Sequence, residues 1–193
     1  MTSALVHRLV ERAGLGPLLA ERERGVVPSG REVSELLARA DLLALGAAAD
    51  IARRRECGDE ARIHIPSAPP ASEGLVVIGR DASLRGTALL RRIVSDRMTG
   101  PIALRIVVDF EMLGLEIAQV ALSFGASDLA GPIASRRGLP MVDRDDQKKM
   151  VKRREIAAYV ERAGLRPVFV STDAREGERG APADSGPRYH VDS

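Results

Sequence analysis

Residues 124–131 (FGASDLAG) form the segment whose residue types are best suited to chemistry. The carboxylate of Asp128 stands near the expected start of a strand, between Gly125 and Gly131, which permit tight backbone geometry. At this place Asp128, with Ser127 beside it, could accept a hydrogen bond from a ligand or act as a base. The same carboxylate could instead cap backbone amides within a turn. The sequence leaves both interpretations open.

A second pair of acids follows another expected strand, over residues 102–110. Asp109 and Glu111 bracket Phe110 at the carboxyl end of this strand, the edge at which open α/β sheets bind ligands. Two acids at this spacing could share a metal ion or a proton, but no third metal ligand stands near them. An aspartate that caps the following helix would occupy the same position as Asp109.

His64 is the histidine best placed to contribute to a site. It lies within the expected strand 61–65, on the opposite face from Ile63 and Ile65, where it could bind a ligand or relay a proton. A hydrogen-bonded structural histidine would show the same pattern. The single cysteine, Cys57, cannot form an internal disulfide or a site that needs several thiolates. We therefore expect no metal site and no cofactor.

The densest positive cluster lies at residues 148–154. Within it Lys148, Lys149 and Lys152 share one face of an expected helix, and such a face could contact a phosphate group or an RNA backbone. A solvated helix face is the alternative, because aspartates at 143–146 offset much of the charge. The sequence contains no glycine-rich nucleotide loop and no hydrolase motif.

Expected strands and helices alternate along most of the chain, a pattern that favours parallel βα units. The strands are expected over 61–65, 75–79, 102–110, a short stretch after 125, and 167–172. The helices are expected over 3–13, 17–23, 31–56, 86–96, 112–124 and 145–163. The pattern predicts an α/β fold with N-terminal helices and about five strands, either a small partial barrel or an open, mainly parallel sheet.

The longest expected helix, 31–56, begins after a possible capping box. Ser29 and Glu32 have the spacing at which each side chain satisfies a free backbone amide at a helix start. Apolar residues then recur with a period of 3.6 residues. Leu42 and Leu45 lie off this stripe, which predicts packing against more than one element.

The length of 193 residues suits one ordinary domain. We expect a single domain over 1–172, with a helical segment at 3–57, and a disordered tail at 173–193 that is rich in glycine, proline and charge. A net charge of +2 and an aromatic content of 3% argue against a nucleic-acid partner. The single cysteine and the lack of a long apolar run predict a cytoplasmic protein without a membrane span.

Two stretches of the chain are similar to a known family. The first is 38–65, which contains DLLALGAAAD at 41–50, and the second is 115–131 (LEIAQVALSFGASDLAG), followed by a helix and AGLRPVFVSTD. Together they resemble the radical SAM enzymes of the futalosine route to menaquinone, aminofutalosine synthase and dehypoxanthine futalosine cyclase, and the related FO synthase. The resemblance covers about half of the chain. The later block is the more specific, because it matches in order and spacing.

The family's cluster motif, C-x₃-C-x₂-C, is missing from this sequence. In the family these cysteines follow soon after the strand that matches 61–65, but here PSAPPASEG follows, and Cys57 precedes the strand. The resemblance therefore implies a shortened, non-catalytic relative that binds a nucleoside-like molecule or a full-length enzyme of the pathway. Asp128 matches the aspartate of the family's Gly-Ala-x-Asp block, which implies a place near the substrate end of the barrel.

Two other functions stay open. One is a small iron-independent enzyme acting on a nucleoside-like substrate, with Asp109, Glu111 and Asp128 as its acids and His64 as a possible base. The other is a regulatory nucleic-acid-binding protein that uses the 148–154 cluster. A sheet short of its usual neighbours also predicts a homo-oligomer or a protein partner, because an open edge must be covered.

Overall fold

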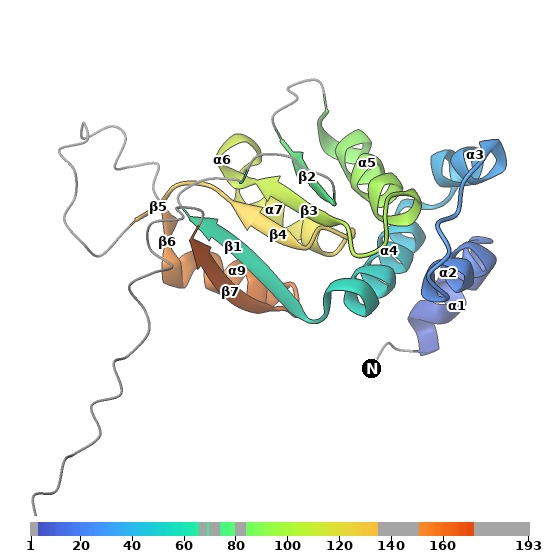
Figure 1. The fold of residues 1–193 in the computed structure, drawn as a ribbon, viewed down its shortest axis with the longest axis horizontal. Coiled ribbons are helices and arrows are strands. Elements are labelled where there is room, and N and C mark those ends of the chain that lie inside the picture. Colours follow the sequence, from blue (N-terminus) through green and yellow to red (C-terminus); the bar gives the residue numbers. More distant parts are fainter. Residues whose placement is uncertain (1–3, 66–68, 70–73, 80–83, 135–150, 172–193) are drawn as a thin grey trace, which may run out of the picture.

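The computed structural model describes residues 4–65, 69, 74–79, 84–134 and 151–171 (Figure 1). Its main sheet has five parallel strands in the order β2-β3-β4-β1-β7. The strands are β1 (Glu60–Ile65), β2 (Leu75–Ile78), β3 (Arg105–Asp109), β4 (Asp128–Ala130) and β7 (Arg166–Ser171). Of the two expected forms, the open parallel sheet is confirmed. Strand β1 lies between β4 and β7, so strands that follow one another in the chain are not always neighbours.

The described helices that connect the strands pack on one face of this sheet. Helix α5 (Gly86–Thr99) joins β2 to β3, α6 (Phe110–Leu113) and α7 (Leu115–Leu122) join β3 to β4, and α9 (Arg153–Arg162) precedes β7. These connections all advance in the same direction across the sheet, so right-handed crossovers place their helices on the same side. In Figure 1, α7 and α9 lie behind the strands.

The two faces of the sheet differ in what they bury. Alternate strand residues, including Ile63, Ile106 and Leu129, join the main core together with the helices. On the other face Val107 and Ala130 form a separate small cluster with Leu75 and Val77, all of them strand residues. We call this second side the open face, since no described helix packs on it, although Val107 and Ala130 at its centre are fully buried.

The N-terminal segment folds as four helices: α1 (Ala4–Arg12), α2 (Gly16–Glu23), α3 (Arg31–Arg39) and α4 (Leu42–Cys57). The prediction of one helix over 31–56 is wrong, because the chain is extended at Ala40 and a new helix starts at Leu42, capped by Asp41. The Asp41 carboxylate accepts the N–H groups of Leu43 and Ala44 at 3.0 Å. The predicted capping box is also wrong, since α3 starts after Gly30 without a side-chain cap.

Two further predicted helices have different limits. The helix expected over 112–124 is two helices, α6 and α7, separated by Gly114. The described part of the helix expected over 145–163 begins at Arg153, because Val151–Lys152 form strand β6 and pair with β5 (Ile133–Ala134). Residues 145–150 and the predicted tail 173–193 lie outside the described residues.

A buried ionic network fixes the N-terminal helices to the rest of the domain. Glu56 of α4 binds Arg22 of α2, with Oε1 2.6 Å from Nε, and Arg97 of α5, with Oε2 3.1 Å from Nη1. Arg22 also donates to the carbonyl oxygens of Gly100 and Pro101. Burial lowers the pKa of Arg97 from its ordinary value. Glu56 thus links α4 both to α2 and to α5, so these buried charges stabilise the packing of the helices.

Candidate functional site

His64 and Asp128, which are 64 positions apart in the chain, meet on the open face. Nε2 of His64 lies 2.8 Å from Oδ2 of Asp128. Their strands, β1 and β4, are parallel neighbours in which Arg62 stands beside Asp128 and His64 beside Ala130. The imidazole therefore reaches Asp128 diagonally, within the range of long cross-strand pairs. Sheet pairing brings together two residues that sequence reasoning selected separately.

Arg105 completes this group from the other side of β4. Its Nη2 lies 2.5 Å from Oδ1 of Asp128. Arg105 begins β3, two residues before Val107, which is the register partner of Asp128. We call Arg105, Asp128 and His64 the Asp128 cluster. Sequence reasoning missed Arg105, although the alternation along 105–109 places it on the same face as Asp109, which was considered.

Asp128 is almost completely buried, with 1% of its surface exposed. His64 is 8% exposed, and 18% of the Arg105 side chain is exposed. Removing a carboxylate from water is expensive unless a positive group lies against it. Arg105 supplies that charge. Its Nε makes no hydrogen bond within the described residues.

The Asp128 cluster combines two chemical abilities. A buried aspartate that holds an imidazole can orient it for hydrogen bonding or for proton transfer. An arginine beside it offers several donors in a planar array that suits oxygen acceptors. The arrangement can therefore bind a polar ligand, and it can hold a histidine ready to move a proton.

Ser127 faces away from this cluster. It is fully buried, and its hydroxyl accepts the backbone N–H of Ile106 at 3.0 Å. This bond ties the start of β4 to β3 and helps to place Asp128, the next residue. A direct ligand contact by Ser127 stays a prediction from the sequence alone.

Asp109 occupies the end of β3 and is half-buried. Its carboxylate accepts the N–H of Glu111 at 3.0 Å and caps α6, which is the alternative that the sequence left open. The side chain of Glu111 is exposed. Within the described residues no group of three or more His, Cys, Asp or Glu side chains is placed to hold a metal ion. The ligand role of these two acids stays a prediction.

The predicted basic cluster lies only partly within the described residues. Lys148 and Lys149 are outside them, and Lys152 and Arg154 are exposed. The guanidinium carbon of Arg153 lies 5.1 Å from the centre of the Phe169 ring. In its described part the cluster therefore contains three exposed cations, of which Arg153 lies over the Phe169 ring of β7.

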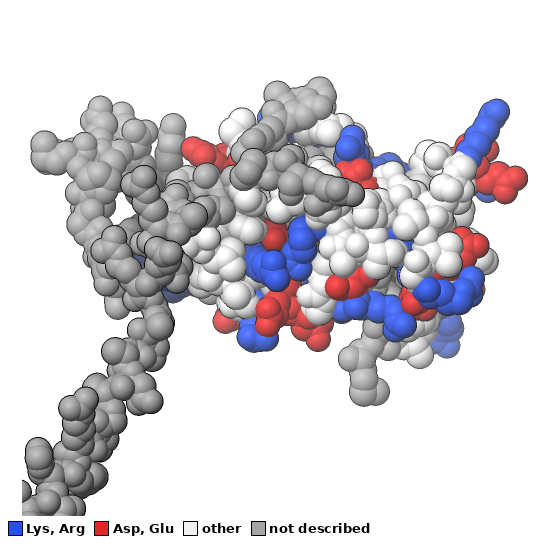
Figure 2. Space-filling model, viewed as in Figure 1, with Lys and Arg blue, Asp and Glu red and all other residues white. Residues whose placement is uncertain are grey.

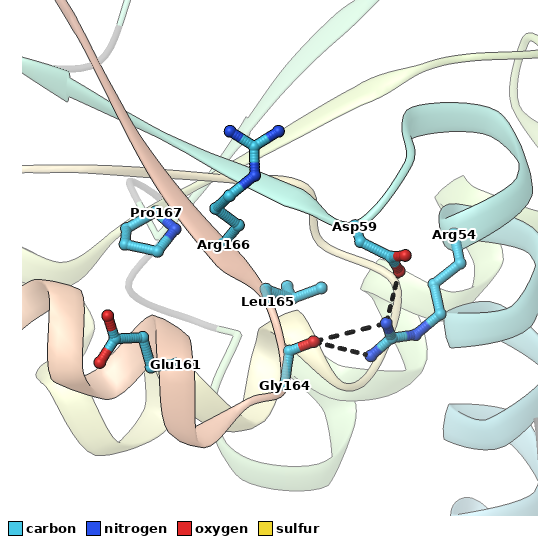
Figure 3. Close-up of a pocket in the computed structure, with 7 residues that line it drawn as sticks. All are labelled: Arg54, Asp59, Glu161, Gly164, Leu165, Arg166 and Pro167. Carbon is cyan, nitrogen blue, oxygen red and sulfur yellow. Dashed lines mark hydrogen bonds and ion pairs between the residues drawn. The ribbon is translucent and has the colours of Figure 1, made fainter. Parts of the chain in front are cut away.

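A hollow of 480 Å³ lies at the edge of the sheet where β1 and β7 begin (Figure 3). One of the two arginines that line it, Arg54, donates to Asp59 at 2.6 Å and to the carbonyl oxygen of Gly164. Burial opposes the charge of Arg54, but hydrogen bonds and Coulombic attraction from Asp50 and Asp59 raise its pKa above the ordinary value. None of the residues predicted as site residues lines this hollow, whereas two of them, His64 and Asp128, meet in the Asp128 cluster, so we place the candidate site there.

Comparison of the chain with protein-family models, curated proteins and solved structures finds no match. None of the described helices has the length and apolar character needed to cross a membrane. The structure thus places the chain in the α/β class with an open parallel sheet.

Proposed function

We propose that this chain is a non-catalytic ligand-binding protein, a shortened relative of the radical SAM enzymes of the futalosine route, and that its Asp128 cluster binds a small nucleoside-like molecule. One observation carries the proposal. Asp128, 1% exposed, contacts both Arg105 and His64 on the face of the sheet that no described helix covers.

The stability of the fold does not require charged residues at the positions of the Asp128 cluster. Replacing a buried ion pair by well-packed apolar residues is often neutral or stabilising. The neighbouring positions on the open face, Val107 and Ala130, are apolar and buried, so this part of the sheet accommodates such residues. Binding of a polar ligand would explain why the Asp128 cluster is charged, whereas packing of the sheet does not explain it.

The chemistry of the cluster suits a nucleoside. The hydroxyl groups of ribose and the edges of a base donate and accept hydrogen bonds, and Asp128, His64 and Arg105 offer both acceptors and donors. The match of Asp128 to the family's Gly-Ala-x-Asp block points to the same class of ligand. A full-length enzyme of the pathway, the other partner that the resemblance implies, would be captured by a surface rather than by this cluster.

Saturation-transfer NMR with inosine and adenosine tests the proposal on the full chain. We expect transfer to at least one nucleoside with the natural protein, and a loss of about tenfold or more in affinity with Asp128→Asn, because a hydrogen bond to a charged group is lost. Glu35→Gln makes the same carboxylate-to-amide change at an exposed acid of α3 and should bind as the natural protein does. No transfer to either nucleoside, or equal binding by Asp128→Asn, would overturn the proposal.

A second candidate is an iron-independent enzyme that acts on a nucleoside-like substrate. The contact of 2.8 Å between His64 and Asp128 favours it, because this pairing orients a histidine for acid–base work. Chromatographic detection of the free base, after incubation of inosine with chelator-treated protein, separates the two candidates. Turnover that is lost in His64→Gln would establish an enzyme, and binding without turnover would leave the binding protein.

A further inference from the structure

The open face carries unbalanced positive charge around Asp128. Arg62 of β1 is the direct register partner of Asp128. Its side chain is exposed, and its guanidinium has no ion-pair partner in the part of the chain that the structure describes. Asp128 is already paired with Arg105. One carboxylate therefore stands beside two arginines.

The two arginines flank Asp128 from the neighbouring strands. Arg62 belongs to β1 and Arg105 to β3, with β4 between them, and the register places both side chains on the open face. Figure 2 shows the molecule from the same side as Figure 1, with a compact group of Lys and Arg atoms where β1 and β4 lie and acidic atoms beside it. Asp109 also belongs to this face, but its carboxylate caps α6.

Arg105 has unused hydrogen-bonding capacity. Its Nη2 lies 2.5 Å from Oδ1 of Asp128 as an ion pair without hydrogen-bond geometry, and its Nε is buried and has no acceptor within the described residues. Buried N–H groups are nearly always paired in folded proteins, so this N–H is suited to an acceptor oxygen that a ligand would bring. A second carboxylate from the described residues does not reach it.

We infer that the ligand of the Asp128 cluster carries an oxyanion, a phosphate or a carboxylate, which Arg62 and Arg105 bind together. The inference rests on the proposed function and names the chemistry of its ligand. Asp128 neutralises one of the two guanidinium charges and holds Arg105 in place, so the other charge remains for the ligand. Planar guanidinium groups match phosphate and carboxylate oxygens through paired N–H bonds. His64, on the other oxygen of Asp128, is left for the uncharged part of the ligand.

Calorimetric titration of the full chain with inosine and with inosine 5′-monophosphate tests the inference. We expect the monophosphate to bind about tenfold tighter or more, since it adds charge-assisted hydrogen bonds. Arg62→Gln should remove this advantage and leave the affinity for inosine unchanged. Arg154→Gln, which changes an exposed arginine on α9, should leave both affinities unchanged. Thermal unfolding of each variant checks that it is folded.

Inorganic phosphate and acetate, titrated separately, show which oxyanion is preferred. The arginine Nε–Hε resonances report binding directly, and an Arg105→Lys variant identifies the signal of Arg105. We expect this signal to shift with phosphate, with acetate or with both.

The possible negative results distinguish a failure of the oxyanion inference from a failure of the proposed function. Equal affinity for inosine and its monophosphate, with no shift of the Arg105 signal, would overturn the oxyanion and leave the proposed function standing. A saturable shift with phosphate or acetate, lost in Arg62→Gln, would support the oxyanion even if no nucleoside bound, and the proposed nucleoside ligand would then be wrong. If none of the four probes bound, both proposals would fall.

Discussion

Nε2 of His64 lies 2.8 Å from Oδ2 of Asp128, across the boundary between β1 and β4. This relationship depends on the position of β1, which lies between β4 and β7 and away from β2, the next strand in the chain. The same carboxylate binds Arg105 from β3. Three strands of the sheet thus meet at one buried acid on the open face.

Substitution of Asp128 tests whether its ion pair with Arg105 contributes to the stability of the fold. We expect Asp128→Leu to lower the free energy of unfolding by about 2 kcal/mol, because it leaves Arg105 without its counter-charge, with part of the penalty relieved where Arg105 reaches solvent. The double variant Asp128→Leu, Arg105→Leu should recover much of this loss. Urea unfolding of the natural protein, both single variants and the double variant measures the coupling. Additive effects of the two substitutions would contradict a coupled pair.

Glu56 should matter more to stability than any exposed acid. In Glu56→Gln two fully buried arginines, Arg22 and Arg97, lose their shared carboxylate, and we expect a loss of about 3–5 kcal/mol. Glu35→Gln breaks an exposed ion pair with Arg31 and should change stability by less than about 1 kcal/mol. Urea unfolding compares the two. Similar losses would show that the buried network contributes no more than a surface pair.

The start of α4 gives a test of helix capping. Asp41→Ala removes a side chain that accepts two backbone N–H groups, so it should destabilise the protein by about 1 kcal/mol. Ser29→Ala should have almost no effect, because Gly30 precedes α3 and no side chain caps that helix. Thermal unfolding measures both. A loss of thermal stability in Ser29→Ala as large as that in Asp41→Ala would show that Ser29 does cap α3.

Substitution of two glycines with positive φ distinguishes the stability cost of backbone strain from that of steric crowding. Gly125 has φ +103°, and a Cβ there would meet Cβ of Ala49 at 3.0 Å and Cβ of Arg97 at 3.1 Å. Gly25 has φ +80° and open space around it. Gly25→Ala should cost about 1 kcal/mol from strain alone. Gly125→Ala should cost clearly more, because α4 and α5 must also move apart. Equal losses in urea unfolding would contradict the close packing at Gly125.

Much of the fold follows from local patterns in the sequence. Alternation around Ile63 and Ile65 indicates β1 and places His64 on the other face, and the apolar run at 75–78 indicates β2. The long helix was wrong because the apolar period continues across Asp41, while the side chain of that residue competes for the backbone amides and starts a new helix. A periodicity argument does not detect such a change of direction.

The candidate site depends on strand order, which local patterns do not contain. His64 and Asp128 each had the residue type and position of a site residue, but their pairing requires that β1 insert beside β4. Arg105 stood at the start of a strand whose predicted limits began three residues earlier, at 102, so nothing in the sequence linked it to Asp128. Tertiary pairing of distant strands supplied this part of the site.

The most direct test of the account is a map of backbone amide shifts in ¹⁵N-labelled protein as inosine 5′-monophosphate is added. We predict saturable shifts centred on His64, Arg105 and Asp128, with Arg62 beside them. Shifts centred on the hollow near Arg54 and Gly164, or no saturable shifts at all, would contradict a ligand site at the Asp128 cluster.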